Sequence, residues 1–210
     1  MCRLKSCLVL KDRVFCPDYN SHQSMLEELG IEDDYLHASK TFVRVELTPP
    51  DGVQSLMDPL DKWTLKVDQD VTPEWWDEKA DRQRVEEAVE AWRREHVFAD
   101  GEHIVKAGKV YALDSATVKA YDSATVKAWG RATVKAWGRA TVIAWGRATV
   151  EAYSNATVEA CDSAMVEAYN SATVKAYDNA MVKAFNRAIA IFPEERKIIC
   201  PAGWTTETHE

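Results

Sequence analysis

The sequence predicts a chain of two parts, a small α+β N-terminal domain followed by a β-solenoid of octapeptide repeats. Three observations support this fold class. From residue 108 onward the sequence repeats every eight residues without a change of phase. Within each repeat, small apolar residues alternate with larger ones, which is the pattern of a strand with two unlike faces. The residues before the repeat lack this period and instead mix strand and helix signals.

Each repeat unit is an octad that reads as one short strand and one corner. Residues 116–123 (ATVKAYDS) are followed by residues 124–131 (ATVKAWGR), and ten octads run from residue 108 to Arg187 if the degenerate first copy is included. A fixed period of this kind indicates a repeat architecture. The last two residues of each octad, for example Asp-Ser, Gly-Arg or Ser-Asn, favour turns and tolerate left-handed backbone. An eleventh copy begins at Ala188 and stops at Pro193.

The small residues of each octad, Ala-Val-Ala, are expected to face inward. A narrow coil has no room for the Thr, Lys and aromatic side chains that alternate with them. A core of such small side chains implies a thin, flattened coil, for which two octads per coil fit best. Ten octads then predict about five coils, a stack of roughly 24 Å at ~4.8 Å per strand.

Coils of sixteen residues place alternate octads on two outer sides. On one side an unbroken series of rings, named here the aromatic column, consists of Tyr121, Trp137, Tyr153, Tyr169 and Phe185. Met165 and Met181 lie beside it. A row of exposed apolar side chains of this extent predicts a contact surface. The alternative is that neighbouring rings only stabilise the stack.

The occupant expected on the aromatic column is a protein partner or a second copy of the chain. In an antiparallel two-fold contact, Lys119 and Lys135 of one copy would face Glu151 and Glu167 of the other. A stable contact needs about 1,000 Å² or more, which a five-coil side can supply. The sequence therefore predicts a homodimer, or a partner protein that takes its place.

Basic and indole side chains interleave in three successive octads and form a second candidate site. Aromatic platforms beside Arg and Lys can bind an anionic nucleotide or single-stranded nucleic acid. The alternative is a purely structural role, in which Gly allows the chain to turn at the corner and Arg is an exposed corner residue. The residues of this anion patch are Lys127, Trp129, Arg131, Lys135, Arg139, Trp145 and Arg147.

The residues before the repeat predict the element order β-β-α-β-β-α. Lys11-Asp12 is expected to form a hairpin turn between two alternating segments. Ser21 or Ser24 can cap a short helix that ends at Gly30, and Thr72-Pro73 can open a long helix that runs to about His96. The two remaining strands are expected at residues 41–47 and 62–67.

The chain is therefore divided into residues 1–103, an α+β domain that caps the solenoid, residues 104–192, the solenoid, and residues 193–210, a C-terminal cap and tail. Ile189, Ile191 and Phe192 are larger than the Ala-Val-Ala core and are expected to contribute to that cap, together with Ile198, Ile199 and Trp204. Capping is expected because an open terminal coil exposes unpaired strand edges.

The chain shows little sign of metal or catalytic chemistry. Cys2, Cys7, Cys16 and His22 are the right ligand types for zinc, but their spacing matches no paired zinc motif, and buried free thiols are the commoner case. A phosphate-binding glycine loop and a nucleophile elbow are both missing. We therefore expect no enzyme, no cofactor and no catalytic residue. Without a signal-peptide core near the start, a cytoplasmic location with reduced thiols is expected.

The octads, together with residues 62–70 (KWTLKVDQD), residues 73–76 (PEWW) and residues 1–6 (MCRLKS), resemble poorly characterised octapeptide-repeat β-solenoid proteins of gut bacteria and of their phages and mobile elements. The resemblance covers most of the chain. It implies a similar opening segment ahead of a repeat array, and it transfers no catalytic residue.

These observations predict a non-catalytic binding protein that uses the rigid side of a solenoid. The leading expectation is a phage-type inhibitor of a host defence or nucleic-acid enzyme, anti-CRISPR-like or anti-restriction-like. One alternative is binding of a nucleotide or single-stranded nucleic acid through the Trp, Lys and Arg octads, and another is a structural self-assembly module. No contact with a membrane is expected.

Overall fold

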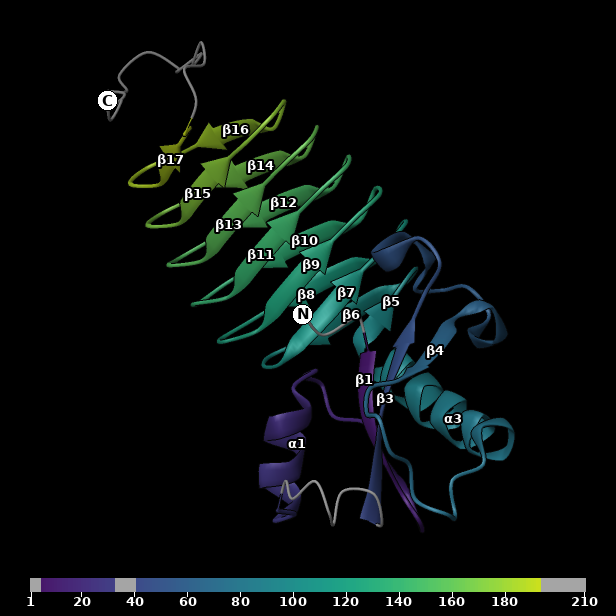
Figure 1. The fold of residues 1–210 in the computed structure, drawn as a ribbon. Coiled ribbons are helices and arrows are strands. Elements are labelled where there is room, and N and C mark those ends of the chain that lie inside the picture. The colour runs from purple at the N-terminus through teal and green to yellow at the C-terminus, as the bar shows by residue number, and fades with distance from the viewer. Residues whose placement is uncertain (1–4, 33–40, 194–210) are drawn as a thin grey trace. The chain divides into compact units, whose positions relative to one another are not determined.

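The computed structural model describes residues 5–32 and 41–193. The chain divides into two compact units, Met1–His96 and Val97–Glu210 (Figure 1). The division falls earlier than the boundary expected after residue 103. The reason is that β5 (Val97–Phe98) and β6 (Glu102–Val105) already pair with strands of the octad region, although their sequences do not follow the octad pattern.

The first unit contains an antiparallel sheet of four strands in the order β2-β1-β3-β4. The strands are β1 (Lys5–Leu10), β2 (Val14–Phe15), β3 (Phe42–Thr48) and β4 (Thr64–Val67). The predicted turn at Lys11-Asp12 is confirmed, because the Leu10 N–H donates to the Arg13 carbonyl over 2.8 Å. Two short 3-10 helices, Gly52–Ser55 and Leu60–Lys62, lie between β3 and β4.

Among the residues that the structure describes, two helices complete the first unit, and the predicted order β-β-α-β-β-α is confirmed. Helix α1 (His22–Leu29) is capped by Ser21, whose hydroxyl accepts the Ser24 N–H, and it ends at Gly30 with a φ of 63°. Helix α3 (Glu78–His96) begins later than the predicted Thr72-Pro73 start. Asp77 caps it instead, since its Oδ1 accepts the N–H groups of residues 79 and 80 over 3.0 and 3.1 Å.

The alternation of side chains along β1 divides the core of the first unit between the two faces of its sheet. Leu8 and Leu10 are buried in one cluster with Met25 and Leu26 of α1. The other face carries the alternate residues of β1, among them Lys5, whose Nζ lies 4.9 Å from the centre of the Trp92 ring of α3. The sheet therefore lies between two helices, each of which buries its apolar side chains.

The second unit is a parallel β-solenoid in which strands alternate between two sheets (Figure 1). The six-stranded sheet contains β6, β8 (Thr117–Ala120), β10 (Thr133–Ala136), β12 (Thr149–Ala152), β14 (Met165–Ala168) and β16 (Met181–Ala184). The seven-stranded sheet contains β5, β7 (Lys109–Ala112), β9 (Thr125–Ala128), β11 (Thr141–Ala144), β13 (Thr157–Ala160), β15 (Thr173–Ala176) and β17 (Ile189–Ile191).

The register of these strands confirms two octads per coil. Val134 pairs with Val118 on one side and with Val150 on the other, so equivalent positions sixteen residues apart lie directly above one another. The predicted five coils are extended by an upstream coil that β5 and β6 begin.

The Ala-Val-Ala positions face inward, as predicted. Val118, Val134 and Val150 are fully buried, and so are the alanines that flank them. The Thr and Lys positions between them are half-buried or exposed. Because the inward side chains are small, the two sheets can approach closely and exclude water from a narrow core.

Each corner depends on one residue with left-handed backbone. The seventh residue of the octads has a positive φ whether it is Asp122 (52°), Gly138 (71°) or Ser154 (60°). Glycine adopts this conformation most readily, and a Cβ at Gly138 would make a close contact of 3.2 Å with the backbone nitrogen of Asp122. Hydrogen bonds between coils continue through the corners, for example from the Arg139 N–H to the Asp122 carbonyl over 3.0 Å.

The last described coil corrects one expectation about the cap. Ile189 and Ile191 pair with Thr173 and Lys175, so they occupy outward positions and are 56% and 38% exposed. Phe192 packs against the solenoid core, as expected of a cap residue. The remaining cap residues, from residue 194 onward, lie outside the described residues. No helix within residues 5–32 and 41–193 is long and apolar enough to cross a membrane.

Candidate functional site

The aromatic column is a continuous stack of rings along the side formed by the six-stranded sheet. Its four successive centroid distances, from Tyr121 to Phe185, are 4.9, 5.4, 5.0 and 4.9 Å, and the interplanar angles are 8–10°. These distances follow from the spacing of parallel strands, about 4.8 Å. Each internal ring therefore has both faces covered by its neighbours, and its edge is the part that a partner can contact.

The charges beside the aromatic column are paired within the chain. Lys135 Nζ lies 3.0 Å from Glu151 Oε1, and Lys183 Nζ lies 3.0 Å from Glu167 Oε1. Lys119 Nζ lies 2.7 Å from Oε1 of Glu102, and Glu102 precedes the octads. Lys119 and Lys135, which the sequence places opposite Glu151 and Glu167 of a second copy, thus already have carboxylate partners within the chain.

Tyrosine hydroxyls complete this network. Tyr153 donates to Glu151 over 2.7 Å and Tyr169 donates to Glu167 over 2.9 Å. The hydrogen bond to Glu151 raises the pKa of Tyr153 to about 12, and the same bond is the main reason that the pKa of Glu151 is lowered. The pKa of Glu167 is lowered first by Lys183 and then by Tyr169. The side is therefore close to neutral, and these rings are held in one orientation.

Exposed methionines lie along the same side. Met165 and Met181 pair with each other in register, and their side chains are 43% and 60% exposed. Methionine adapts its shape to a partner at low cost because its side chain is unbranched and polarisable. The six-stranded side thus combines a rigid stack of ring edges with two adaptable apolar groups.

The structure separates the residues of the predicted anion patch. Lys127, Trp129, Arg131, Trp145 and Arg147 belong to the octads of the seven-stranded sheet and to the corners that follow them, whereas Lys135 and Arg139 belong to the six-stranded sheet and to the opposite corners. The sixteen-residue coil is the cause of this separation, because adjacent octads lie on opposite sides.

Lys109 is a cation of this region that the sequence did not single out, because it lies in the degenerate first octad. It is close enough to Lys127 to lower the pKa of that amine, although burial is the larger cause. Within the described part of the chain, neither lysine forms an ion pair. Lys109 Nζ lies 5.4 Å from the centre of the Tyr111 ring. Two unpaired cations therefore lie together on the seven-stranded side.

Both faces of the Trp129 ring are covered. Trp129 stacks on Trp145 with a centroid distance of 4.3 Å, and on its other side it stacks on Tyr111 at 6.2 Å. A nucleobase cannot insert between rings at these distances. The column on this side is interrupted at Cys161, a small residue at the position where the neighbouring octads carry Trp145 and Tyr177.

Filling this interruption is expected to stabilise the solenoid. In Cys161→Tyr, the new ring would stack between Trp145 and Tyr177 as the rings of the aromatic column do, and we expect the free energy of unfolding to rise by about 1 kcal/mol. Cys161→Ser is the matched control and adds no ring. Chemical unfolding followed by circular dichroism measures both variants, and a destabilised Tyr variant would show that the position cannot hold a ring.

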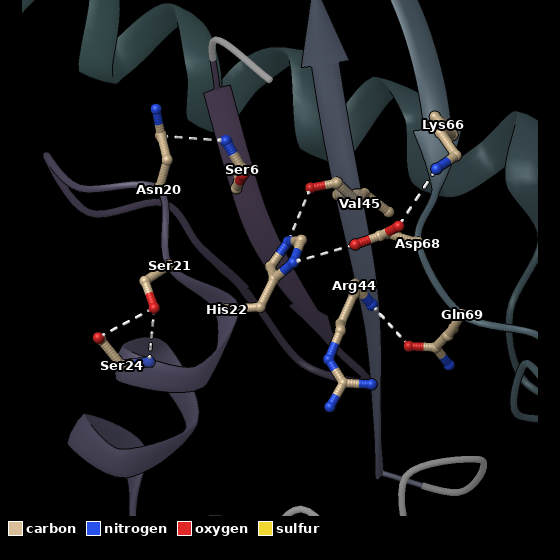
Figure 2. A network of polar contacts seen from close by, with 10 residues as sticks. All are labelled: Ser6, Asn20, Ser21, His22, Ser24, Arg44, Val45, Lys66, Asp68 and Gln69. Atoms are coloured by element: carbon tan, nitrogen blue, oxygen red, sulfur yellow. Dashed lines mark hydrogen bonds and ion pairs between the residues drawn. The ribbon is translucent and has the colours of Figure 1, made fainter. Parts of the chain in front are cut away.

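The candidate zinc ligands that the structure describes, Cys7, Cys16 and His22, are not gathered into a metal site. Within residues 5–32 and 41–193, no group of three or more His, Cys, Asp and Glu side chains is placed to hold a metal ion. Cys2 lies outside the described residues. His22 lies between two other acceptors, since Nε2 is 3.2 Å from the Val45 carbonyl oxygen and Nδ1 is 3.7 Å from Asp68 Oδ2 (Figure 2).

His22 also predicts how stability depends on pH. Its pKa is lowered from 6.5, with burial as the largest cause, although Val45 and Asp68 oppose the shift. The unfolded chain therefore binds a proton more readily, and the stabilisation present above pH 6.5 is lost as pH falls through the folded pKa. We expect unfolding midpoints to decrease as pH falls below 6.5, where the unfolded chain takes up the proton, and His22→Gln to flatten this decrease. An unchanged slope in the variant would show that other groups are responsible.

The fold and its surfaces define a class, a parallel β-solenoid built from octads and joined to a small α+β unit. The chain matches no known family model, no curated protein and no solved structure. The chemistry of its own surfaces is therefore the basis for the functional proposal.

Proposed function

We propose that this is a non-catalytic protein-binding solenoid that docks through the side formed by its six-stranded sheet. The observation that supports the proposal is the stacked aromatic column, whose neighbouring charges are already paired within the chain. A surface that is ordered before binding loses little side-chain entropy when a partner arrives. Because the charges are neutralised, an apolar partner surface can approach without leaving an unpaired ion.

A second copy of the chain is the occupant that this chemistry suits best. A two-fold contact buries the same patch on both copies, so the patch must be compatible with itself. A near-neutral side with exposed Met165 and Met181 satisfies that condition, whereas the seven-stranded side would bring Lys109 and Lys127 toward their own equivalents. The proposed homodimer thus depends on apolar contact rather than on the ion pairs between copies that the sequence suggested.

The proposal is tested by charges placed at matched positions on the two sides. Met165→Glu with Met181→Glu leaves the stacked rings intact and is expected to weaken self-association at least 100-fold. Thr157→Glu with Thr173→Glu introduces the same charges at the same octad position on the seven-stranded sheet and should leave association unchanged. Sedimentation velocity over a concentration series measures the self-association of both double variants. Equal effects of the two double variants would contradict docking through the six-stranded side.

The resemblance extends the proposal to a biological role, an inhibitor of a host defence or nucleic-acid enzyme in the bacterial cytoplasm. In this role the same side would bind the target enzyme. The wild-type chain should then reduce the activity of that enzyme in a host lysate, the Thr157/Thr173 double variant should do so equally, and the Met165/Met181 double variant should not. Inhibition that survives in the Met165/Met181 variant would contradict this role for the six-stranded side.

The unpaired Lys109 and Lys127 support a second candidate function, the binding of phosphate-bearing ligands on the seven-stranded side. Oligo-dT is a suitable probe because its phosphates attract these cations, while its bases cannot insert between Trp129 and the rings that cover its two faces. Phosphate contacts predict an affinity that falls steeply with salt, and a loss of binding in Lys127→Ala but not in Lys175→Ala. Fluorescence anisotropy measures this, and salt-independent binding would exclude phosphate recognition.

A further inference from the structure

The first unit holds two cysteines near the β1–β2 hairpin, Cys7 on β1 and Cys16 directly after the last residue of β2. The register of β1 and β2 pairs Leu8 with Phe15, so the next pair is Cys7 with Cys16. Leu10 and Arg13 form a hydrogen-bonded pair, since the Leu10 N–H donates to the Arg13 carbonyl. Such pairs alternate along an antiparallel ladder, and Cys7–Cys16 is therefore a pair without backbone hydrogen bonds between its members.

This kind of pair brings side chains closest together. Its Cα atoms are typically about 4.5 Å apart, which is within the range that a disulfide spans without backbone movement. The two thiols are close enough to shift one another's pKa, which is raised at Cys7 and lowered at Cys16. Pro17 follows Cys16 and has no N–H to continue the ladder, which accounts for the end of β2 at this point.

A buried lysine lies next to the pair. Side-chain alternation places Lys5 on the same face of β1 as Cys7, and Lys5 is fully buried. Its ammonium group donates to the carbonyl oxygen of Pro17 and lies 3.4 Å from both the Tyr19 carbonyl oxygen and Asn20 Oδ1. A charge held at this position favours the ionised form of a nearby thiol.

The two thiols differ in reactivity. Cys7 is fully buried, and burial is the largest reason that its pKa is raised well above the ordinary value. Cys16 is half-buried, and its pKa is lowered first by the hydrogen bond from Cys7, against the effect of burial, and further by Lys5. The thiolate therefore forms at the more accessible sulfur, which is the usual arrangement of an oxidisable thiol beside a resolving one.

We propose that Cys7 and Cys16 form a reversible cross-strand disulfide, with Cys16 as the thiol that a peroxide oxidises first and Cys7 as the thiol that resolves it. The Cys16 thiolate attacks one peroxide oxygen, the O–O bond breaks, and the leaving hydroxide takes up a proton to become water. Cys7 Sγ then attacks the sulfenic sulfur of Cys16. The S–S bond forms, the S–O bond breaks, and the hydroxyl leaves with the Cys7 proton as a second water.

The consequence is a covalent link between the edge strand β2 and the centre of the sheet. Two thiols lose two electrons, and one peroxide is reduced to two waters. Because β2 contains two residues, it has few contacts of its own to hold it, and the link restricts the segment that leads to α1. The oxidised chain should unfold at a temperature about 5 °C higher than the reduced chain.

The test uses the full chain with Cys2, Cys161 and Cys200 changed to Ser, so that only the pair remains. Hydrogen peroxide should then remove two hydrogen atoms from the intact mass, produce one linked peptide containing both cysteines, and be reversed by dithiothreitol. With Cys7→Ser added, Cys16 should accumulate as a sulfenic acid that dimedone traps. With Cys16→Ser added instead, the buried Cys7 should stay unmodified.

The wild-type chain supplies a comparison that requires no variant. Cys161 has a raised pKa, with burial as the largest cause and the acidic residues Asp178, Asp162 and Glu159 as further causes. Cys16 should therefore react with peroxide at least about 10-fold faster than Cys161 near neutral pH. Equal rates at the two sites, or oxidation of the pair to sulfinic acid without a linked peptide, would overturn the proposal.

Discussion

Replacing Val150 with Asp is expected to lower the free energy of unfolding by about 3–5 kcal/mol. Val150 is fully buried at the centre of β12, and it pairs in register with Val134 and Val166. A carboxylate at this position meets only apolar side chains from the coils on both sides. Neither a counter-charge nor a hydrogen-bond donor is available to it within the Ala-Val-Ala core.

The control for this prediction is the neighbouring residue. Thr149→Asp introduces the same group one position earlier, on the outward face, and should lower the free energy of unfolding by less than about 1 kcal/mol. Denaturant midpoints from circular dichroism compare the two variants, since a repeat array need not unfold in two states. Equal losses at Val150 and Thr149 would show that the strand faces are assigned wrongly.

Trp137→Ala is expected to give the second largest loss, about 2–4 kcal/mol. The Trp137 ring stacks on Tyr121 at 4.9 Å and on Tyr153 at 5.4 Å, so its removal deletes two stacked pairs and opens a gap in the aromatic column. The loss arises in the isolated chain and needs no partner.

Tyr177→Ala is the matched control because Tyr177 occupies the same octad position on the other side and has no ring contact within the described residues. Its loss should be about 1 kcal/mol. Thermal unfolding of dilute protein compares the two variants. Equal losses would mean that stacking contributes little, and that the rings are present for another reason.

The repeat made the solenoid predictable, and the reason is its symmetry. Once the small residues of one octad are placed inside, every other octad must follow, and the sixteen-residue coil determines which rings share a column. The same rule implies that Lys135 lies directly beside Glu151. Sequence alone could not show whether these side chains pair within the chain or across a dimer interface, because that depends on the side-chain conformations of the folded chain.

The segments that the sequence did not predict correctly are those that do not follow the octad pattern. Residues 97–105 form strands because they pair with β7 and β8, although their own sequence does not follow the octad pattern. Ile189 and Ile191 suggested a cap by their size, but the register with β15 turns them outward. At the start of α3, Thr72-Pro73 resembles a helix entry, yet Asp77 supplies the carboxylate that satisfies the first N–H groups.

The arrangement of the two cysteines in the first unit was predictable only in part. The two-residue turn at Lys11-Asp12 already implies that Cys7 and Cys16 face one another. The presence of Lys5 in the core next to them could not be predicted, because lysine is rarely buried. Its partners are carbonyl oxygens of residues that follow β2, and the path of that segment is a property of the folded unit.

Docking through the six-stranded side is tested most directly by sedimentation equilibrium of the wild-type chain over a concentration series that reaches about 50 μM, where a complex of micromolar affinity is largely formed. A dimer that dissociates on dilution, and that is lost in the Met165→Glu/Met181→Glu variant, is the predicted result. A wild-type chain that remains monomeric at the highest concentration would contradict self-association through the aromatic column.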